Sequence, residues 1–470
     1  MLLRMLMIYS PMETFQSNGD WWVPGVSEKI SGKVSFSPTQ GVVLELNGKL
    51  PAERDEPEDL LRTGLEKNYN LLYGDLGRDG SVTVQDATIT SAHFGGQNES
   101  EEYLAERMVV GEHLPENPSF VRADFVVDEI PSWTNSSTVR PVVDSESVEE
   151  IVDFGEIMEV YAATSPIDYT ADLDRIQIEL SNYSKTSFGI TSAEIETVGV
   201  LKVISDDEVS LSSLLGYGNL ALEYLSFAVG TGVYPDKIKL RTERDAQPLD
   251  AYYTLIDHTT DTTSSKADYL FHPQYADFET TLRNWIELCE SAPEVHENYR
   301  LLMHRSNISP RLRFLATVIA LEAFHDSEHQ SEKLVSEEEF DTIQSDIMDV
   351  VPEDTDLQNQ IYGLLENVAN TPSIKDKLLN LMESEQEIIE MFFDISELAS
   401  EARNRRNEVA HGSTDATSRE LWILSMKLIL VLEVLLARRI GVPEKKLPDA
   451  LISRHRGLVE QLDISGVREE

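Results

Sequence analysis

The 470-residue chain is predicted to be an α+β multidomain protein, with a β-rich, β-sandwich-like N-terminal region followed by an all-α C-terminal helical bundle. Two observations predict this division. Short segments of β-branched and aromatic residues, separated by turn formers, dominate the first half, whereas apolar residues at helical spacing dominate the second. The length suits two to four domains, and we expect a β-rich domain over residues 1–275, in one or two lobes, and a helical domain over 276–470.

Several segments of the first half carry the strand pattern. They are residues 33–36, 42–46, 82–89, 120–127, 175–180 and 195–203. The sequence Arg78-Asp79-Gly80 is typical of the turn of a β-hairpin. One helix is expected in this half, at about residues 210–229, and it is followed by Gly230-Thr231-Gly232.

Helical spacing begins after about residue 275. Phe278, Leu282, Trp285 and Leu288 form one apolar stripe, and a second stripe runs from Leu312 to Phe324. The acidic stretch 326–356 is expected to be a loop with a short helix, and the helical pattern returns over 374–410. Thr417 or Ser418 can cap a last long helix at about 418–440.

The charge balance is strongly acidic, with 84 Asp and Glu against 39 Lys and Arg, a formal net charge of −45. The acidic residues are spread along the chain, which is typical of a folded surface exposed to concentrated salt, where repulsion is screened. We therefore expect the cytosol of a halophile, and an ordinary acidic protein is the alternative. The charge argues against a general nucleic-acid binder, because such binding depends on Lys and Arg.

The chain has one cysteine, Cys289, so it cannot form an intrachain disulfide, and a reducing cytoplasmic location is expected. Residues 1–12 are apolar but too short to span a membrane, and 421–437 contains Ser425, Lys427 and Glu433, so we expect no membrane association. His325 and His329 have a spacing that can bind zinc, but a third ligand is missing. No metal and no cofactor are expected.

The segment 398–412, LASEARNRRNEVAHG, carries the main chemical signal. On a helix, Asn404, Asn407 and His411 share one stripe. Arg406 lies about 140° from His411 around an ideal helix. Its side chain must therefore curl back, or a distorted helix or a second subunit must bring it to the histidine.

Arg406-Asn407-Glu408-Val409-Ala410-His411 resembles the RNxxxH signature of HEPN ribonucleases. Looser Arg-to-His spacings also occur by chance, as in Arg107 to His113. The adjacent Asn407, the long helix before it, Gly412 after it and the apolar helix that follows favour Arg406 to His411 as the true motif. The structural alternative is a helix end whose histidine interacts with the terminal carbonyls.

The first half carries a second resemblance. The segments Trp21-Trp22-Val23-Pro24-Gly25, 30–37 and 41–46, together with Trp133 and the helix and Thr-Gly turn of 220–235, resemble the ApeA N-terminal domain. Residues 314–324, FLATVIALEAF, are similar to the first long helix of an ApeA-like HEPN domain.

These resemblances imply a metal-independent endoribonuclease that acts as the RNA-cleaving effector of anti-phage abortive infection. His411 would be the general base or acid, Arg406 would stabilise the phosphate charge, and Asn407 would orient either group. RNA supplies its own 2′-OH nucleophile, so the products would be a 2′,3′-cyclic phosphate and a 5′-OH.

Supporting roles are assigned to three further residues. Arg403 and Arg405 would hold the RNA backbone. The alternative interpretation is that they are solvated charges on the surface of the helix. Glu322 would pair with an active-site arginine, and its alternative is to be an ordinary surface residue. The resemblance also implies a homodimer through the HEPN domain.

The expected partners are an RNA substrate, with tRNA as one candidate, and a phage-derived trigger. The competing function is a noncatalytic HEPN dimerisation or nucleotide-binding module whose β-rich domain recognises a phage or host component. A third reading is a carbohydrate- or protein-binding β-rich region, suggested by Trp21 and Trp22, although these residues are expected to lie in the core.

Overall fold

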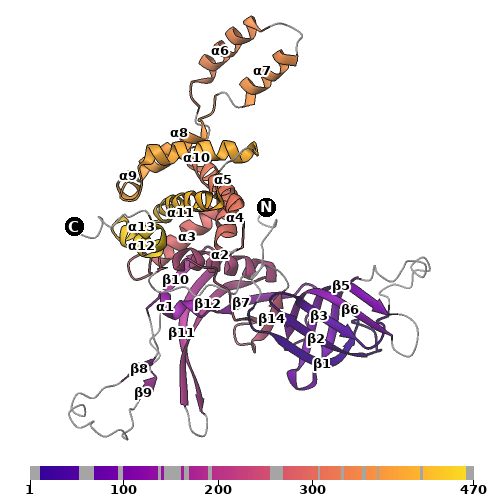
Figure 1. The fold of residues 1–470 in the computed structure, drawn as a ribbon. Helices are drawn as coiled ribbons and strands as arrows, with labels where there is room; N and C mark the ends of the chain where they lie inside the picture. Colours follow the sequence, from indigo (N-terminus) through magenta and orange to yellow (C-terminus); the bar gives the residue numbers. More distant parts are fainter. Residues whose placement is uncertain are drawn as a thin grey trace, which may run out of the picture. The chain divides into compact units, whose positions relative to one another are not determined.

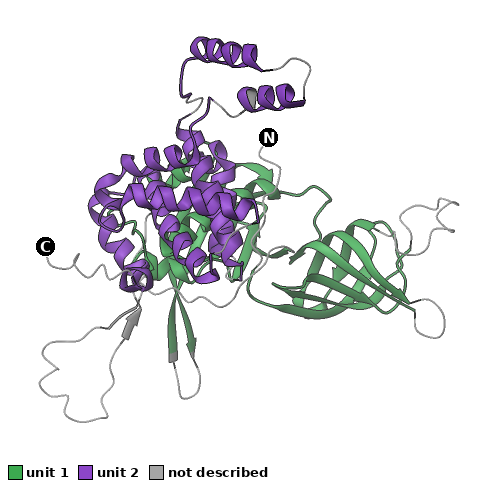
Figure 2. Cartoon of the chain, turned by 45° about the horizontal axis from the view of Figure 1, so that its top comes forward, with its two compact units in different colours: residues 1–285 green, residues 286–470 purple. Residues whose placement is uncertain are grey.

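The computed structural model describes residues 11–51, 68–93, 99–135, 139–141, 160–162, 169–188, 193–253, 268–304, 307–329, 333–351, 356–367, 370–412 and 416–461. The chain divides into two compact units, residues 1–285 and 286–470 (Figure 2). The first unit is rich in strands, and the region from 278 to 461 is helical (Figure 1). The predicted fold class is confirmed.

A β-barrel occupies the N-terminal part of the first unit. Its strands are β1 (Phe15–Trp22), β2 (Ile30–Ser37), β3 (Gly41–Leu46), β4 (Asn68–Asp75), β5 (Ser81–His93) and β6 (Ser100–Val110). They pair in the order β6-β3-β2-β1-β4-β5, and β5 pairs back with β6 to close the barrel. The short 3-10 turn η2 (Gly77–Asp79) joins β4 to β5 at the predicted hairpin. The strand-rich region therefore contains a closed barrel.

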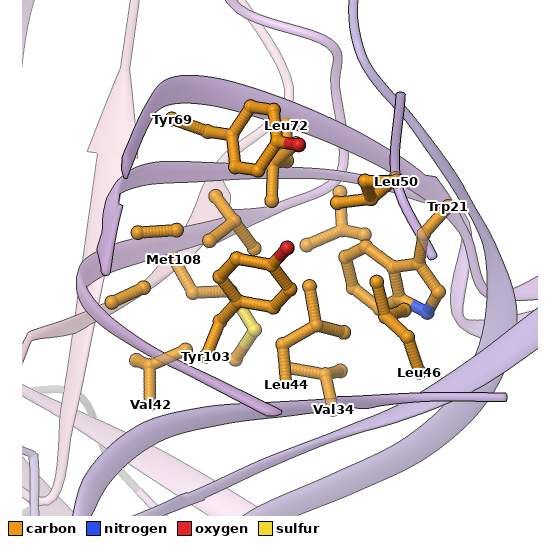
Figure 3. Close-up of a cluster of buried hydrophobic side chains, with 14 of the residues drawn as sticks. Trp21, Val34, Val42, Leu44, Leu46, Leu50, Tyr69, Leu72, Tyr103 and Met108 are labelled. Carbon is orange, nitrogen blue, oxygen red and sulfur yellow. The ribbon is translucent and has the colours of Figure 1, made fainter. Parts of the chain in front are cut away.

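The barrel is filled by alternate side chains of its strands, because successive residues of a strand point to opposite faces. Trp21, Val34, Leu44 and Tyr103 are fully buried within it (Figure 3). Trp22 is half-buried, and its ring lies 4.0 Å from the Lys29 amine in a cation–π contact. Only the first of the two adjacent tryptophans is thus a core residue.

The sheet continues beyond the barrel into the remainder of the first unit. Its strands there are β7 (Ser119–Val126), β10 (Tyr169–Leu173), β11 (Ile176–Phe188), β12 (Ala193–Ser210), β13 (Lys237–Arg241) and β14 (Leu249–Tyr253). They pair in the order β10-β11-β12-β7-β13-β14, and β14 joins β6 of the barrel. A short helix, α1 (Glu129–Trp133), follows β7, and β8 (Val139–Pro141) pairs with β9 (Val160–Ala162).

The predicted helix of the first half is α2 (Leu211–Val229), which packs on β7 and β12. Ser210 caps its N-terminus by accepting a hydrogen bond from the Ser213 amide. Gly230 ends it in the left-handed conformation, with a φ of 86°. The helix approaches the sheet closely because Gly218 has no side chain to meet the Phe125 ring.

The helices of the C-terminal half follow the predicted order. They are α3 (Phe278–Ser291), α4 (Pro293–His304), α5 (Pro310–Glu328), α6 (Glu337–Val350), α7 (Asp356–Asn367), α8 (Ile374–Ser384), α9 (Gln386–Ile389), α10 (Ile395–Ala410), α11 (Ser418–Ile440), α12 (Leu447–Arg454) and α13 (Arg456–Gln461). Helix α5 contacts α4, α8, α10 and α11. Thr417 caps α11 in a capping box with Glu420, as predicted. Helix α6 has 14 residues, so the stretch expected to be mainly loop is largely helical.

A buried ionic network joins three helices of the second unit. The Glu433 carboxylate of α11 forms an ion pair with Arg454 Nη2 at 2.9 Å and accepts hydrogen bonds from His455 Nε2 at 2.6 Å and Tyr299 Oη at 3.1 Å. Glu433 is 2 % exposed, so these partners replace the water that the charge loses on folding. The network fixes α12 against α11 and α4.

Candidate active site

Helix α10 carries the predicted motif, and its sequence explains both of its ends. The Asp394 side chain caps the N-terminus by accepting a 2.7 Å hydrogen bond from the Glu397 amide. At the C-terminus the His411 amide still donates to Asn407 O at 3.0 Å. Gly412 follows with a φ of 69°, a conformation that favours glycine and ends the helix. The helix is continuous over the motif.

One side of α10 is packed and the other is open. Ile395, Leu398, Ala402 and Val409 are buried, because they recur at the spacing of a single helix face. His411 is exposed at the far end of the helix. The motif residues therefore lie on the solvent side or at the border of the packed side.

The predicted site residues of α10 have different environments. Arg403 and His411 are exposed, whereas Arg406 and Asn407 are half-buried. Arg403, Asn407 and His411 follow one another at i, i+4 and i+8, so they form one ridge of the helix. Since α10 is continuous, helix distortion does not bring Arg406 to His411, and a curled side chain or a second subunit remains.

Arg406 is half-buried, and its positive charge acts on Glu322 of α5. Burial raises the pKa of Glu322, while the positive charges of Arg406 and Lys377 oppose that rise. Lys377 of α8 is itself bound to the Asp326 carboxylate, with Nζ to oxygen distances of 2.6 and 2.8 Å. The pairing of Glu322 with an active-site arginine stays a prediction, and Arg406 is the motif arginine whose charge acts on Glu322.

Arg405 has a partner within its own helix. Its Nη1 lies 2.7 Å from Oε2 of Glu408, three residues further on, and this bond raises the pKa of Arg405. The pair is about one-third exposed at both side chains, so it resembles a solvated surface ion pair. This geometry favours the structural reading of Arg405 over an RNA-binding role.

Arg311 is a cation of this region that the sequence did not reveal. It lies in the first turn of α5, and its Nη2 donates a 2.5 Å hydrogen bond to the carbonyl of Val409. The last carbonyls of a helix have no partner within it and carry partial negative charge. Arg311 thus adds a positive charge at the end of α10 that bears His411. The only sequence signal was a pair of arginines in PRLRF, 98 residues before Val409.

His325 of α5 and His329, which follows the end of that helix, do not form a metal centre with other residues of the described part of the chain. The rings of His325 and His329 are 4.6 Å apart, and His325 Nδ1 lies 3.3 Å from Asp326 Oδ1. Burial lowers the pKa of His325. Among the described residues, no group of three or more His, Cys, Asp or Glu side chains is arranged to hold a metal ion.

The chain has a strand-rich domain with a barrel, followed by a helical bundle that exposes an Arg-Asn-x-x-x-His helix end. These features define a two-domain protein of the HEPN class. Comparison with family models agrees. The model of ApeA N-terminal domain 1 matches residues 16–285, and the model of the Apea-like HEPN domain matches residues 315–446. The chain therefore belongs to the ApeA-like family. No curated protein matches it.

The resemblance predicted from the sequence is confirmed by these two matches. The HEPN match includes α10 and Glu322, whereas Arg311 precedes it. None of the helices in the described part of the chain is both long and apolar enough to cross a membrane.

Proposed function

We propose that the protein is a metal-independent HEPN endoribonuclease that acts as the RNA-cleaving effector of anti-phage abortive infection. The observation that carries the proposal is the end of α10, where the cation Arg311 binds the Val409 carbonyl between Asn407 and exposed His411, and α10 lies within the match to the Apea-like HEPN model. Residues 1–275 would sense or restrain, and 276–470 would cleave.

RNA cleavage of this type needs only a group that transfers a proton and groups that stabilise the phosphate charge. The 2′-OH of RNA attacks the adjacent phosphorus, and the 5′ oxygen leaves, which gives a 2′,3′-cyclic phosphate and a 5′-OH. His411 would take or give the proton, because imidazole titrates near neutral pH. Arg406 would stabilise the pentacoordinate phosphate, and Asn407 would orient the histidine or the phosphate.

A homodimer would complete the site. Arg406 is half-buried and its charge acts on Glu322, whereas His411 is exposed at the helix end. A second HEPN domain that presents the same helix end would add its own arginine and histidine to one cleft. Arg403 would then hold the flanking RNA backbone. The RNA substrate would be, for example, a tRNA. A phage-derived component would trigger cleavage.

The acidic surface sets the conditions under which this activity is expected. A net charge of −45 repels RNA at low ionic strength, whereas at roughly 1 M salt the Debye length falls to about 3 Å. We propose that the protein works in a salt-rich cytoplasm. Binding of RNA would then depend on shape and short-range hydrogen bonds.

The test compares wild-type protein with His411→Ala and Arg406→Ala on total RNA in high-salt buffer with EDTA. His329→Ala is the matched control, because His329 is also an exposed histidine of the same unit. Wild type and His329→Ala should cleave and leave 2′,3′-cyclic phosphates, whereas the two motif variants should lose at least about a hundredfold in rate. Equal cleavage by wild type and His411→Ala would overturn the site.

A noncatalytic HEPN module is the second candidate, and one observation favours it: Arg406 and His411 lie on different sides of a continuous helix. The β-rich domain would then recognise a phage or host component. If the dimeric protein retains labelled RNA on a filter without cleaving it, this result would support the noncatalytic module against the nuclease.

A further inference from the structure

Helices α6 and α7 form a hairpin that is inserted between α5 and α8. The two helices lie against each other (Figure 1). Asn370 closes the base of the hairpin: its Oδ1 accepts from the Val335 amide at 3.0 Å, and its Nδ2 donates to Val335 O at 3.1 Å. The hairpin therefore has a defined base, between the helices that carry Glu322 and Lys377.

The hairpin leaves an unusual amount of apolar surface in contact with water. Helix α6 has no buried residue. Six of the twelve large apolar side chains that are exposed in the described part of the chain belong to this segment: Leu334, Ile343, Val350, Leu357, Tyr362 and Leu364. Val350 is 80 % exposed and Leu364 is 63 % exposed. Such a concentration is typical of an interaction surface.

The exposed residues follow helical periodicity. In α6, Ile343 and Val350 are seven residues apart, with half-buried Ile347 between them. In α7, Leu357 and Leu364 have the same separation. Each helix thus has an apolar edge that is exposed to solvent. A third helix is the element that covers two such edges.

The charge of the hairpin identifies the kind of helix. The described residues 333–351 and 356–367 contain eight acidic residues and one lysine, a net charge of −7 over 31 residues. The average for the whole chain, −45 over 470 residues, corresponds to about −3 for that length. A second copy of the hairpin would bring together two surfaces of this charge, which repel.

We propose that the hairpin of α6 and α7 is a docking site for a basic amphipathic helix of another protein. The apolar stripe of that helix covers Ile343, Val350, Leu357 and Leu364. Its Lys and Arg residues flank the stripe and face the acidic rims of the hairpin. The site differs from the end of α10, and it does not depend on RNA cleavage.

The test uses a fluorescent 21-residue peptide with Leu at the a and d positions of each heptad and Lys at the flanking positions. A peptide of the same composition in shuffled order lacks the apolar face, and a third peptide has Glu in place of Lys. Binding to the full chain is measured by fluorescence anisotropy at low and high salt. Wild type should bind the first peptide at least about tenfold more tightly than the other two.

Two protein variants locate the site. The variant Ile343→Ser/Leu357→Ser/Leu364→Ser should weaken binding about tenfold, whereas Leu104→Ser/Tyr183→Ser, which alters two equally exposed apolar residues of strands, should not. A charge variant, Glu338→Gln/Asp341→Asn/Asp346→Asn/Asp349→Asn, keeps the apolar face and should reduce the salt dependence of binding. Circular dichroism checks that the helices remain.

Three results would overturn the proposal. Equal affinity of wild type for the ordered and shuffled peptides would mean that charge alone attracts them. Undiminished binding by both hairpin variants would place the peptide elsewhere. A wild-type dimer that the serine variant converts to monomers, measured by light scattering, would make a second copy the occupant.

Discussion

Arg311 Nη2 lies 2.5 Å from the carbonyl oxygen of Val409, so the first turn of α5 is bonded to the last turn of α10, two residues before His411. The Val409 carbonyl also accepts a hydrogen bond from the Gly412 amide at 3.2 Å, and the guanidinium adds a positive charge at the C-terminus of the helix. If the end of α10 is the active site, this bond fixes the backbone from which His411 projects.

We therefore expect Arg311→Ala to lower the rate of RNA cleavage by about tenfold, because loss of a charge-assisted hydrogen bond amounts to about 1.5–3 kcal/mol. Arg311→Lys should restore part of the rate, since it keeps the charge. The kcat and KM of both variants are measured with one RNA, together with the pH profile of kcat. A lowered melting temperature with an unchanged pH profile and kcat would show that the residue only stabilises the fold.

The relation between Glu322 and Arg406 can be measured directly. Burial raises the pKa of Glu322, and the charge of Arg406 opposes that rise, so Arg406→Gln should raise the Glu322 pKa further. Carboxyl carbon chemical shifts, followed by NMR titration, give this value. Arg405→Gln is the control and should leave the Glu322 pKa unchanged, because Arg405 pairs with Glu408. The same pKa in the Arg406 variant would refute this electrostatic relation.

The Glu433 network should dominate the stability of the helical unit. Glu433→Ala leaves Arg454 and His455 buried without their carboxylate, and we expect a loss of about 3–5 kcal/mol in the free energy of unfolding. Burial alone would raise the pKa of Glu433, but Arg454 and His455 hold it below its usual value. Its contribution is thus present above about pH 4.5 and is lost as the pH falls below that. Urea unfolding from pH 3 to pH 7 tests both statements, and a small, pH-independent effect would contradict them.

A group of carboxylates in the first unit is expected to give stability the opposite dependence on pH. Burial, followed by the nearby charge of Asp128, raises the pKa of Asp236 to about 7, and burial also raises the pKa of Glu129 to about 7. The native state therefore holds protons that the unfolded state has released between about pH 4 and pH 7, so stability falls as the pH rises through this range.

Asp236→Asn should remove part of this dependence. The amide donates a hydrogen bond to Asp128 without needing a proton, so the variant should gain about 1 kcal/mol at pH 8 and nothing at pH 4. Calorimetric melting at the two pH values, compared with wild type, measures the gain. Equal shifts at both values would mean that proton uptake is not the cause.

Gly218 is expected to be required for the packing of α2. A Cβ atom at this position would lie 2.2 Å from Phe125 Cζ, and Phe125 is fully buried. Gly218→Ala should therefore destabilise the first unit by about 1–3 kcal/mol. Gly363→Ala in α7 is the matched control, because a Cβ there meets nothing within 4 Å, and it should stabilise its helix by about 0.5–1 kcal/mol. Similar melting temperatures for the two variants would contradict this account.

Much of the secondary structure could be predicted because it depends on residues that are close in sequence. Thr417 and the apolar periodicity after it placed α11, and Ser210 with Gly230 bounded α2. The length of α6 was underestimated, because its many acidic residues resemble a solvated loop and no core contact marks its apolar side. The motif residues were found in the same way, since Arg406, Asn407 and His411 lie within one helix.

By itself the sequence determined the division into a strand-rich half and a helical half, several of the strands and helices, and the polar helix end in a family-specific pattern. The tertiary structure decided two further features: the closure of the barrel by β5 and β6, and the bond from Arg311 to Val409. The physical reason is the sequence separation over which each interaction acts. Periodicity and capping act over a few residues, whereas each of these pairings depends on how separate elements pack, and no local pattern records the partner.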